Sequence, residues 1–162
     1  MKRWTMVILV IVAAALLAPA SSAPTTSRGT YLVFVDDNVA ATSSGDTVEV
    51  ALEDGIFNGA TREASGEGAW TSDALGSGTF TLERLVAFQF YGCGFMGDPT
   101  LCGGRAVFAV HLSGSAELDG LLEVNCQIGS PPPGTSEGTK LNVGSGFNFH
   151  RHVSGENVFV AL

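Results

Sequence analysis

The chain has 162 residues, of which 45% are hydrophobic and 15% charged, and its formal net charge is −8. Its few Lys and Arg residues are scattered along the sequence and form no basic cluster. This distribution argues against nucleic acid and anionic membrane surfaces as partners, because both are recognised by clustered cations.

The N-terminal region has the features of a secretory signal peptide. A basic start precedes an apolar run over residues 6–17, which is shorter than the ~20 residues that span a bilayer. Small side chains favour cleavage after Ala20, with Ala23 as the alternative. We therefore expect a secreted or extracytoplasmic protein with no transmembrane segment in its mature chain.

The remainder divides into two parts. Residues 21–29 are small and polar and predict a flexible lead-in, and residues 30–162 are long enough for one domain with its own core. Without the basic start, about six cations face sixteen acids, so the mature chain carries a charge of about −10. The acids are dispersed, which is typical of a charge that keeps a protein in solution.

Hydrophobic and polar residues alternate along the domain with the period of half-buried strands, and no window has a helical period. Turn-forming residues separate the runs. We predict a single antiparallel all-β domain of eight to nine strands, either a small barrel or a two-sheet sandwich, and favour the barrel. The expected strands cover residues 30–37, 46–55, 55–59, 66–72, 78–92, 104–114, 118–129, 139–153 and 156–162.

The longest run, over residues 78–92, contains an irregularity. Phe80, Leu82, Phe88 and Phe90 share one face by parity, which would also bring Arg84 to the inside. A β-bulge between the two apolar pairs would turn the arginine outward. Such a bulge also suits a strongly curved sheet and therefore favours the barrel.

Three cysteines follow. Cys93 and Cys102 lie in a glycine-rich stretch, Gly92–Gly104, which predicts a loop closed by a disulfide between them. Cys126 falls on the apolar side of its strand, where a free thiol behaves as a small hydrophobe. The alternative is a bond between Cys126 and one of the loop cysteines. No zinc-type cysteine spacing occurs.

The same loop is the candidate contact surface. Phe95, Met96 and Leu101 are apolar residues on a loop that a rigid scaffold would present. This favours a non-catalytic binding or cell-envelope interaction module without a cofactor, whose partner is a protein, a glycan or a small apolar ligand. The alternative is that the three side chains fold back and cap the core.

An enzymatic alternative requires polar residues inside a barrel. Glu123 could act with His111 and Arg105 as acid and base if all three faced inward, as in small-barrel lyases, isomerases or cyclases. Their apolar strand neighbours are the better core candidates, which predicts an outward orientation.

A metal site is the remaining alternative. His150 and His152 are two apart on an expected strand, so both could face one copper or zinc ion. The seven residues from Phe149 to Gly155 resemble the Phe-His-x-His-x-x-Gly stretch of copper–zinc superoxide dismutases. No histidine follows His152, so the further ligands of that enzyme are missing. The solvent face of a strand is therefore the favoured interpretation.

Overall fold

The structure, a computed structural model, describes residues 27–144 and 146–162. The predicted signal peptide, both cleavage positions and most of the expected lead-in lie outside the described residues. The described residues form no helix that is long and apolar enough to cross a membrane.

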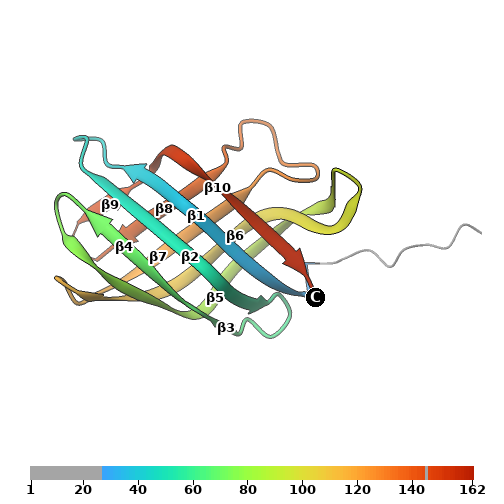
Figure 1. Ribbon diagram of the computed structural model, residues 1–162, viewed down its shortest axis with the longest axis horizontal. Helices are drawn as coiled ribbons and strands as arrows, with labels where there is room; N and C mark the ends of the chain where they lie inside the picture. Colours follow the sequence, from blue (N-terminus) through green and yellow to red (C-terminus); the bar gives the residue numbers. More distant parts are fainter. Residues whose placement is uncertain (1–26, 145) are drawn as a thin grey trace, which may run out of the picture.

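The described residues form ten strands in one antiparallel sheet, which confirms the all-β prediction (Figure 1). Their order in the sheet is β10-β1-β2-β4-β5-β6-β7-β8-β9, and the short β3 pairs with β2. The strands are β1 (Thr30–Ala41), β2 (Thr47–Asn58), β3 (Ala64–Ser65), β4 (Glu67–Ser72), β5 (Gly76–Phe95), β6 (Asp98–Gly114), β7 (Leu118–Cys126), β8 (Gly138–Val143), β9 (Phe147–Phe149) and β10 (Arg151–Ala161).

The sheet rolls into a barrel-like shape that closes at one end. There, β10 pairs with β6 through Phe159 opposite Cys102 and Val160 opposite Leu101, and this completes a ring of six strands. Strands β7, β8 and β9 continue from β6, and β8 lies close to both β1 and β10. The last strand of the chain therefore joins its first strand to the middle of the sheet.

One predicted turn is a strand irregularity instead. Gly55 was expected to separate two strands, but β2 runs through it with a register shift against β1 between Val33 and Val35. Gly55 is packed so closely that an added Cβ would lie 2.6 Å from Val33 Cγ1. A glycine in a bulge and a glycine in a turn have the same local sequence signature.

The bulge expected in the long strand is present. The β5–β6 register shifts between Leu82 and Arg84 and again between Leu85 and Ala87. As a result, Arg84 is exposed and Leu85 is buried in the core. The two shifts keep the apolar side chains on the inner face of a strand that curves with the sheet.

Aromatic side chains fill the interior near the closed end. Phe57 packs at the centre, with ring centroids 5.3 Å from Tyr31, 4.9 Å from Phe88, 5.5 Å from Phe108 and 5.7 Å from Phe159. These residues come from five strands, so their burial fixes the pairing of distant segments. The interior near the closed end is therefore filled by side chains, which leaves the outer surface for contacts with other molecules.

Candidate binding surface

Residues 92–104 form the end of the β5–β6 hairpin, and the prediction of an irregular loop there was wrong. Phe95 pairs with Asp98, which leaves Met96 and Gly97 as a two-residue turn. Their φ angles of 52° and 87° are both positive, as a type I′ hairpin turn requires. The glycines that suggested a loop instead serve the bulges and turn of a continuous hairpin.

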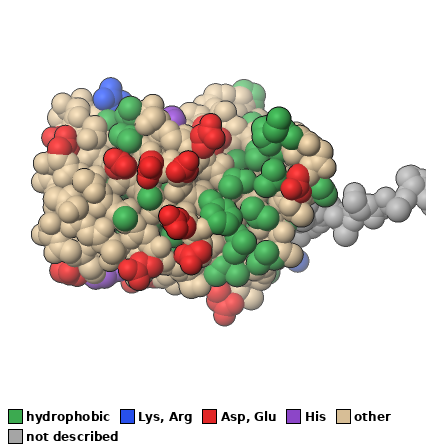
Figure 2. Space-filling model, in the orientation of Figure 1, with side chains coloured by type: hydrophobic (Ala, Val, Ile, Leu, Met, Phe, Trp, Pro, Cys, Tyr) green, Lys and Arg blue, Asp and Glu red, His purple; other side chains and the backbone are tan. Residues whose placement is uncertain are grey.

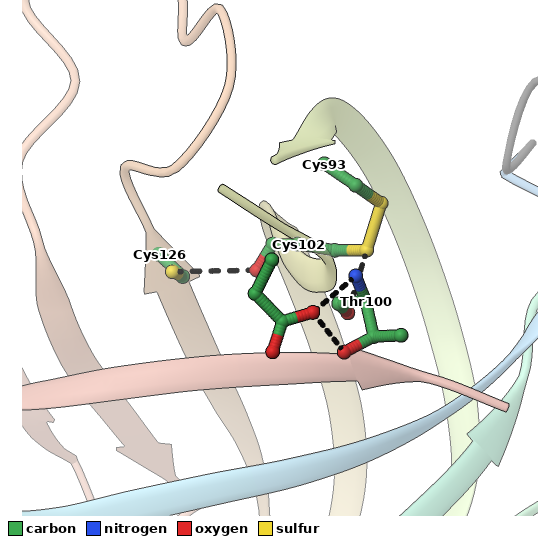
Figure 3. The surroundings of a disulfide bond; sticks show 5 residues. Cys93, Thr100, Cys102 and Cys126 are labelled. Atoms are coloured by element: carbon green, nitrogen blue, oxygen red, sulfur yellow. Dashed lines mark hydrogen bonds between the residues drawn. A yellow bond between two sulfur atoms is a disulfide. The ribbon is translucent and has the colours of Figure 1, made fainter. Parts of the chain in front are cut away.

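The predicted disulfide joins Cys93 and Cys102 directly across the hairpin, with their Cα atoms 3.9 Å apart (Figure 3). It links the two strands just before the tip and restrains the position of the turn. Cys126 is free and buried, as predicted, and its Sγ lies 3.6 Å from the carbonyl oxygen of Cys102. Burial raises the pKa of the Cys126 thiol to about 11, which disfavours the reactive thiolate.

The three residues of the expected contact surface differ in exposure. Met96 at the turn is 91% exposed and Phe95 beside it is 48% exposed. Leu101 is half-buried on β6, opposite Val160. The tip therefore presents a methionine and a phenylalanine to solvent, and Leu101 connects it to the neighbouring strand β10.

A row of apolar residues crosses the outer face of the sheet next to this tip. In the strand register, Ile56 lies opposite Leu32, Leu32 opposite Val160, and Val160 opposite Leu101. A second row contains Phe34 opposite Val158. We call these six residues the apolar band. Figure 2 shows hydrophobic side chains gathered at this end of the molecule, beside a group of acidic side chains.

Acidic residues border the apolar band. Asp36 on β1 lies directly opposite Glu156 on β10, one row beyond Phe34 and Val158, and both acids are exposed. Like charges in this arrangement repel each other. The ion pairs found among the described residues involve Glu123 and His111, and none neutralises Asp36 or Glu156.

A groove of about 760 Å³ lies beside the band, where β10 separates from β6 and β7. Its apolar wall includes Phe95, Leu101, Ile128 and Val158. Its polar wall consists of Gln127, Glu137, Glu156 and Asn157. The groove therefore connects the hairpin tip to the acidic border of the band.

Glu137 holds the two sides of this groove together. Its carboxylate accepts hydrogen bonds from the backbone N–H of Gln127 at 2.6 Å and of Asn157 at 3.2 Å. Burial, with a further contribution from the charge of Glu156, raises the pKa of Glu137. Thus one carboxylate side chain replaces the strand pairing that is absent between β10 and β7.

The residues of the enzymatic alternative lie on the outer face and in separate clusters. Arg105 and Lys140 contact the Glu123 carboxylate at 2.5 and 2.9 Å. Burial alone would raise the pKa of Glu123, but the bonds from the two cations outweigh it and lower the pKa. The structure does not bring His111 to this cluster.

His111 belongs to a second cluster at the end of the β6–β7 hairpin. Its Nδ1 lies 2.7 Å from Asp119 and its Nε2 lies 3.1 Å from Glu117. These two contacts raise the pKa of His111. The arrangement resembles a surface ion-pair network rather than an acid–base pair around a pocket.

The two histidines of the metal alternative have different surroundings. His150 is exposed between β9 and β10, with Nδ1 3.0 Å from the carbonyl oxygen of Asn148. His152 is half-buried on β10, and a Cβ added to Gly138 would lie 1.8 Å from its Nδ1. Over residues 27–144 and 146–162, no cluster of three or more His, Cys, Asp or Glu side chains suits a metal ion.

Sequence reasoning found the hairpin tip but missed the apolar band. The missed signal is the pair of uninterrupted apolar runs at residues 31–35 and 158–162. Strands with apolar residues on both faces are typical of sheets that are covered on both sides. Here the inner face is covered by the core, and the outer face is half-exposed.

Comparison with protein-family models, with curated proteins and with solved structures finds no match to this chain.

Proposed function

We propose that this protein is an exported, non-catalytic binding module whose contact surface is the tip of the β5–β6 hairpin. The observation that carries the proposal is the exposure of Met96 and Phe95 on a hairpin that a disulfide restrains. Ordering an exposed apolar side chain on binding costs conformational entropy, and a preformed tip lowers this cost. The disulfide also fits an oxidising, extracytoplasmic location.

The partner surface must be apolar at the point where the tip inserts. Burial of apolar surface contributes roughly 25 cal/mol per Å². Met96 and Phe95 are therefore the natural anchors, and the half-exposed Leu101 would extend the contact toward the sheet.

A photo-crosslinking experiment tests this proposal. A benzophenone amino acid replaces Met96 in the full chain, which is then expressed and exported by its own host and irradiated. We expect one discrete crosslinked product, and we expect Phe95→Ser in the same chain to reduce its yield at least fivefold.

The matched control places the same amino acid at Ser44, an exposed residue in the β1–β2 turn at the opposite end of the barrel (Figure 1). Equal product from both positions, or no product from either, contradicts a contact surface at the hairpin tip. Unfolding curves of both chains show whether the substitutions disturb the fold.

A further inference from the structure

We propose that the apolar band and its acidic border dock an extended peptide segment of a partner protein that carries apolar residues followed by Lys or Arg. This inference rests on the proposed binding function and specifies the chemistry of the partner. The docking surface consists of the apolar band, the Asp36–Glu156 pair and the adjoining groove with Glu137.

The first support is the uncovered outer face of β1 and β10. Leu32 and Phe34 alternate with fully buried Tyr31 and Val33, so the strand is apolar on both sides. Packing in the core explains why the inner residues are apolar, but it does not explain the apolar residues on the outer face. A run of cross-strand apolar pairs on the outside offers a contiguous surface whose burial by a partner is favourable.

The second support is the placement of charge. Asp36 and Glu156 face each other across neighbouring strands, and their mutual repulsion disfavours folding. Neither carboxylate has an ion-pair partner among the residues the structure describes. A cation supplied by a partner would relieve the repulsion that the isolated domain bears.

The spacing of the rows defines the motif. Side chains two apart on a strand are separated by about 7 Å, so the rows of Leu32, Phe34 and Asp36 follow one another at this interval. An extended partner chain lying along the strands has the same repeat. Its matching pattern is apolar-x-apolar-x-basic, with the basic residue above Asp36 and Glu156.

The groove provides a second position for a cation and an unused acceptor. Glu137 forms part of its wall and has no cationic partner among the described ion pairs. Asn157, which is only 8% exposed, also forms part of the wall, and its Oδ1 is buried without a hydrogen-bond partner. A guanidinium or ammonium group could donate to Asn157 Oδ1 and neutralise the charge of Glu137. A purely apolar ligand would leave the Asn157 oxygen unpaired and Glu137 without a cation.

Charge distinguishes this partner from a second copy of the chain. Two copies docked through this surface would bring two acidic borders together, in a protein that already has sixteen acids against eight cations. A basic segment instead gains from attraction by the whole domain, in addition to the local pairs.

Selection from a random peptide display library on the immobilised mature protein tests the inference. We expect an enriched consensus in which Lys or Arg lies two positions after an apolar residue. A second apolar residue, where the consensus has one, lies two positions before the first. A synthetic peptide of that consensus is then titrated calorimetrically. We expect the double variant Asp36→Asn/Glu156→Gln to weaken its binding at least tenfold and to reduce the salt dependence of the affinity.

The matched control is Glu67→Gln/Glu83→Gln, which removes the same charge from exposed positions on β4 and β5. We expect this variant to change the affinity less than twofold. The melting temperature of Asp36→Asn/Glu156→Gln should not fall, because the substitutions remove a repulsion, so weaker binding would not result from unfolding.

Three results would overturn the inference: no enriched consensus, a consensus without a basic residue, or equal effects of the two double variants. A concentration-dependent dimer that the Asp36 and Glu156 substitutions strengthen would identify a second copy as the occupant instead. A consensus lacking basic residues whose binding requires Phe95 and Met96 would refute this inference but support the proposed function. If Phe95→Ser leaves the affinity for basic peptides unchanged, only the proposed role of the hairpin tip in binding is refuted.

Discussion

Neighbouring cysteines in this protein differ sharply in chemistry because of their positions. Cys93 and Cys102 face each other across a hairpin and are bonded, whereas Cys126, which pairs with Gly104 on the adjoining strand, is enclosed by the core. The apolar enclosure disfavours the thiolate, which is the reactive form of the side chain.

We therefore predict that thiol reagents do not modify Cys126 in the folded protein. Iodoacetamide at pH 8 should modify no cysteine of the native mature chain and one cysteine after denaturation without reductant, as counted by intact mass. Modification of the native protein at the rate of a free thiol would show that the enclosure opens readily.

The raised pKa of the Glu137 carboxyl predicts that the free energy of unfolding depends on pH. Its raised pKa means that the folded state favours the protonated carboxyl relative to the unfolded state. The stability that follows from this preference is fully present below the ordinary pKa of about 4.5 and is lost as the pH rises through the folded value.

Substitution of Glu137 isolates this contribution. We expect wild-type stability, measured relative to Glu137→Gln by urea unfolding, to decrease as the pH rises from 4 toward neutrality. Other titrating groups contribute equally to both proteins and cancel in the difference. A difference that is constant with pH, or that increases with it, would contradict the burial of this carboxyl.

At the scale of strands, glycines with positive φ angles lie inside elements, among them Gly155 in β10 and Gly94 in β5. Gly155 has a φ of +104° within β10, and an added Cβ would lie 2.5 Å from the Cα of Asn38. Gly94 near the hairpin tip has nearly the same φ, +105°, with no atom within 4 Å of such a Cβ. Alanine at either position would have the same backbone strain, but only at Gly155 would its Cβ also collide with a neighbour.

We expect Gly94→Ala to destabilise the protein by about 1–2 kcal/mol, the cost of a left-handed conformation for an L-residue. Gly155→Ala should cost clearly more, because the backbone of Asn38 must also move. Unfolding free energies from guanidinium titration provide the comparison. Equal losses would mean that β10 can shift away from β1 without penalty.

The sequence predicts these elements well where alternation is regular and poorly where glycines interrupt it. The inner residues of β1, β2 and β5 follow from parity, and the bulge at Arg84 follows from a parity conflict. The hairpin end at residues 92–104 does not, because glycines in bulges and in loops are locally indistinguishable. In the structure, the direct pairing of Cys93 with Cys102 shows that both strands continue as far as the turn.

At the scale of the molecule, the described part of the sheet has an apolar inner face and carries the apolar band on its outer face. The hairpin tip could be predicted from sequence because its residues are contiguous. The band could not, because the row that connects Ile56, Leu32, Val160 and Leu101 depends on register between distant segments, and Leu32 and Val160 come from opposite ends of the domain. No local pattern specifies which strands become neighbours.

The two faces of this sheet should respond differently to the same substitution. Val33 is fully buried on the inner face, and Val160 is half-exposed in the apolar band. We expect Val33→Thr to cost about 1–3 kcal/mol, because a hydroxyl enters the core, and Val160→Thr to change stability by no more than about 0.5 kcal/mol. Denaturant unfolding measures both, and a large loss for Val160→Thr would assign the band to the core.

The pairing of the first strand with the last has a consequence for biosynthesis. Until β10 emerges, β1 has no partner on one edge, and the ring cannot close. Such long-range closure is slow, and the growing chain keeps apolar strands exposed during synthesis. The ring can therefore close only after β10 has been made, and until then one edge of β1 stays open to pairing with other chains.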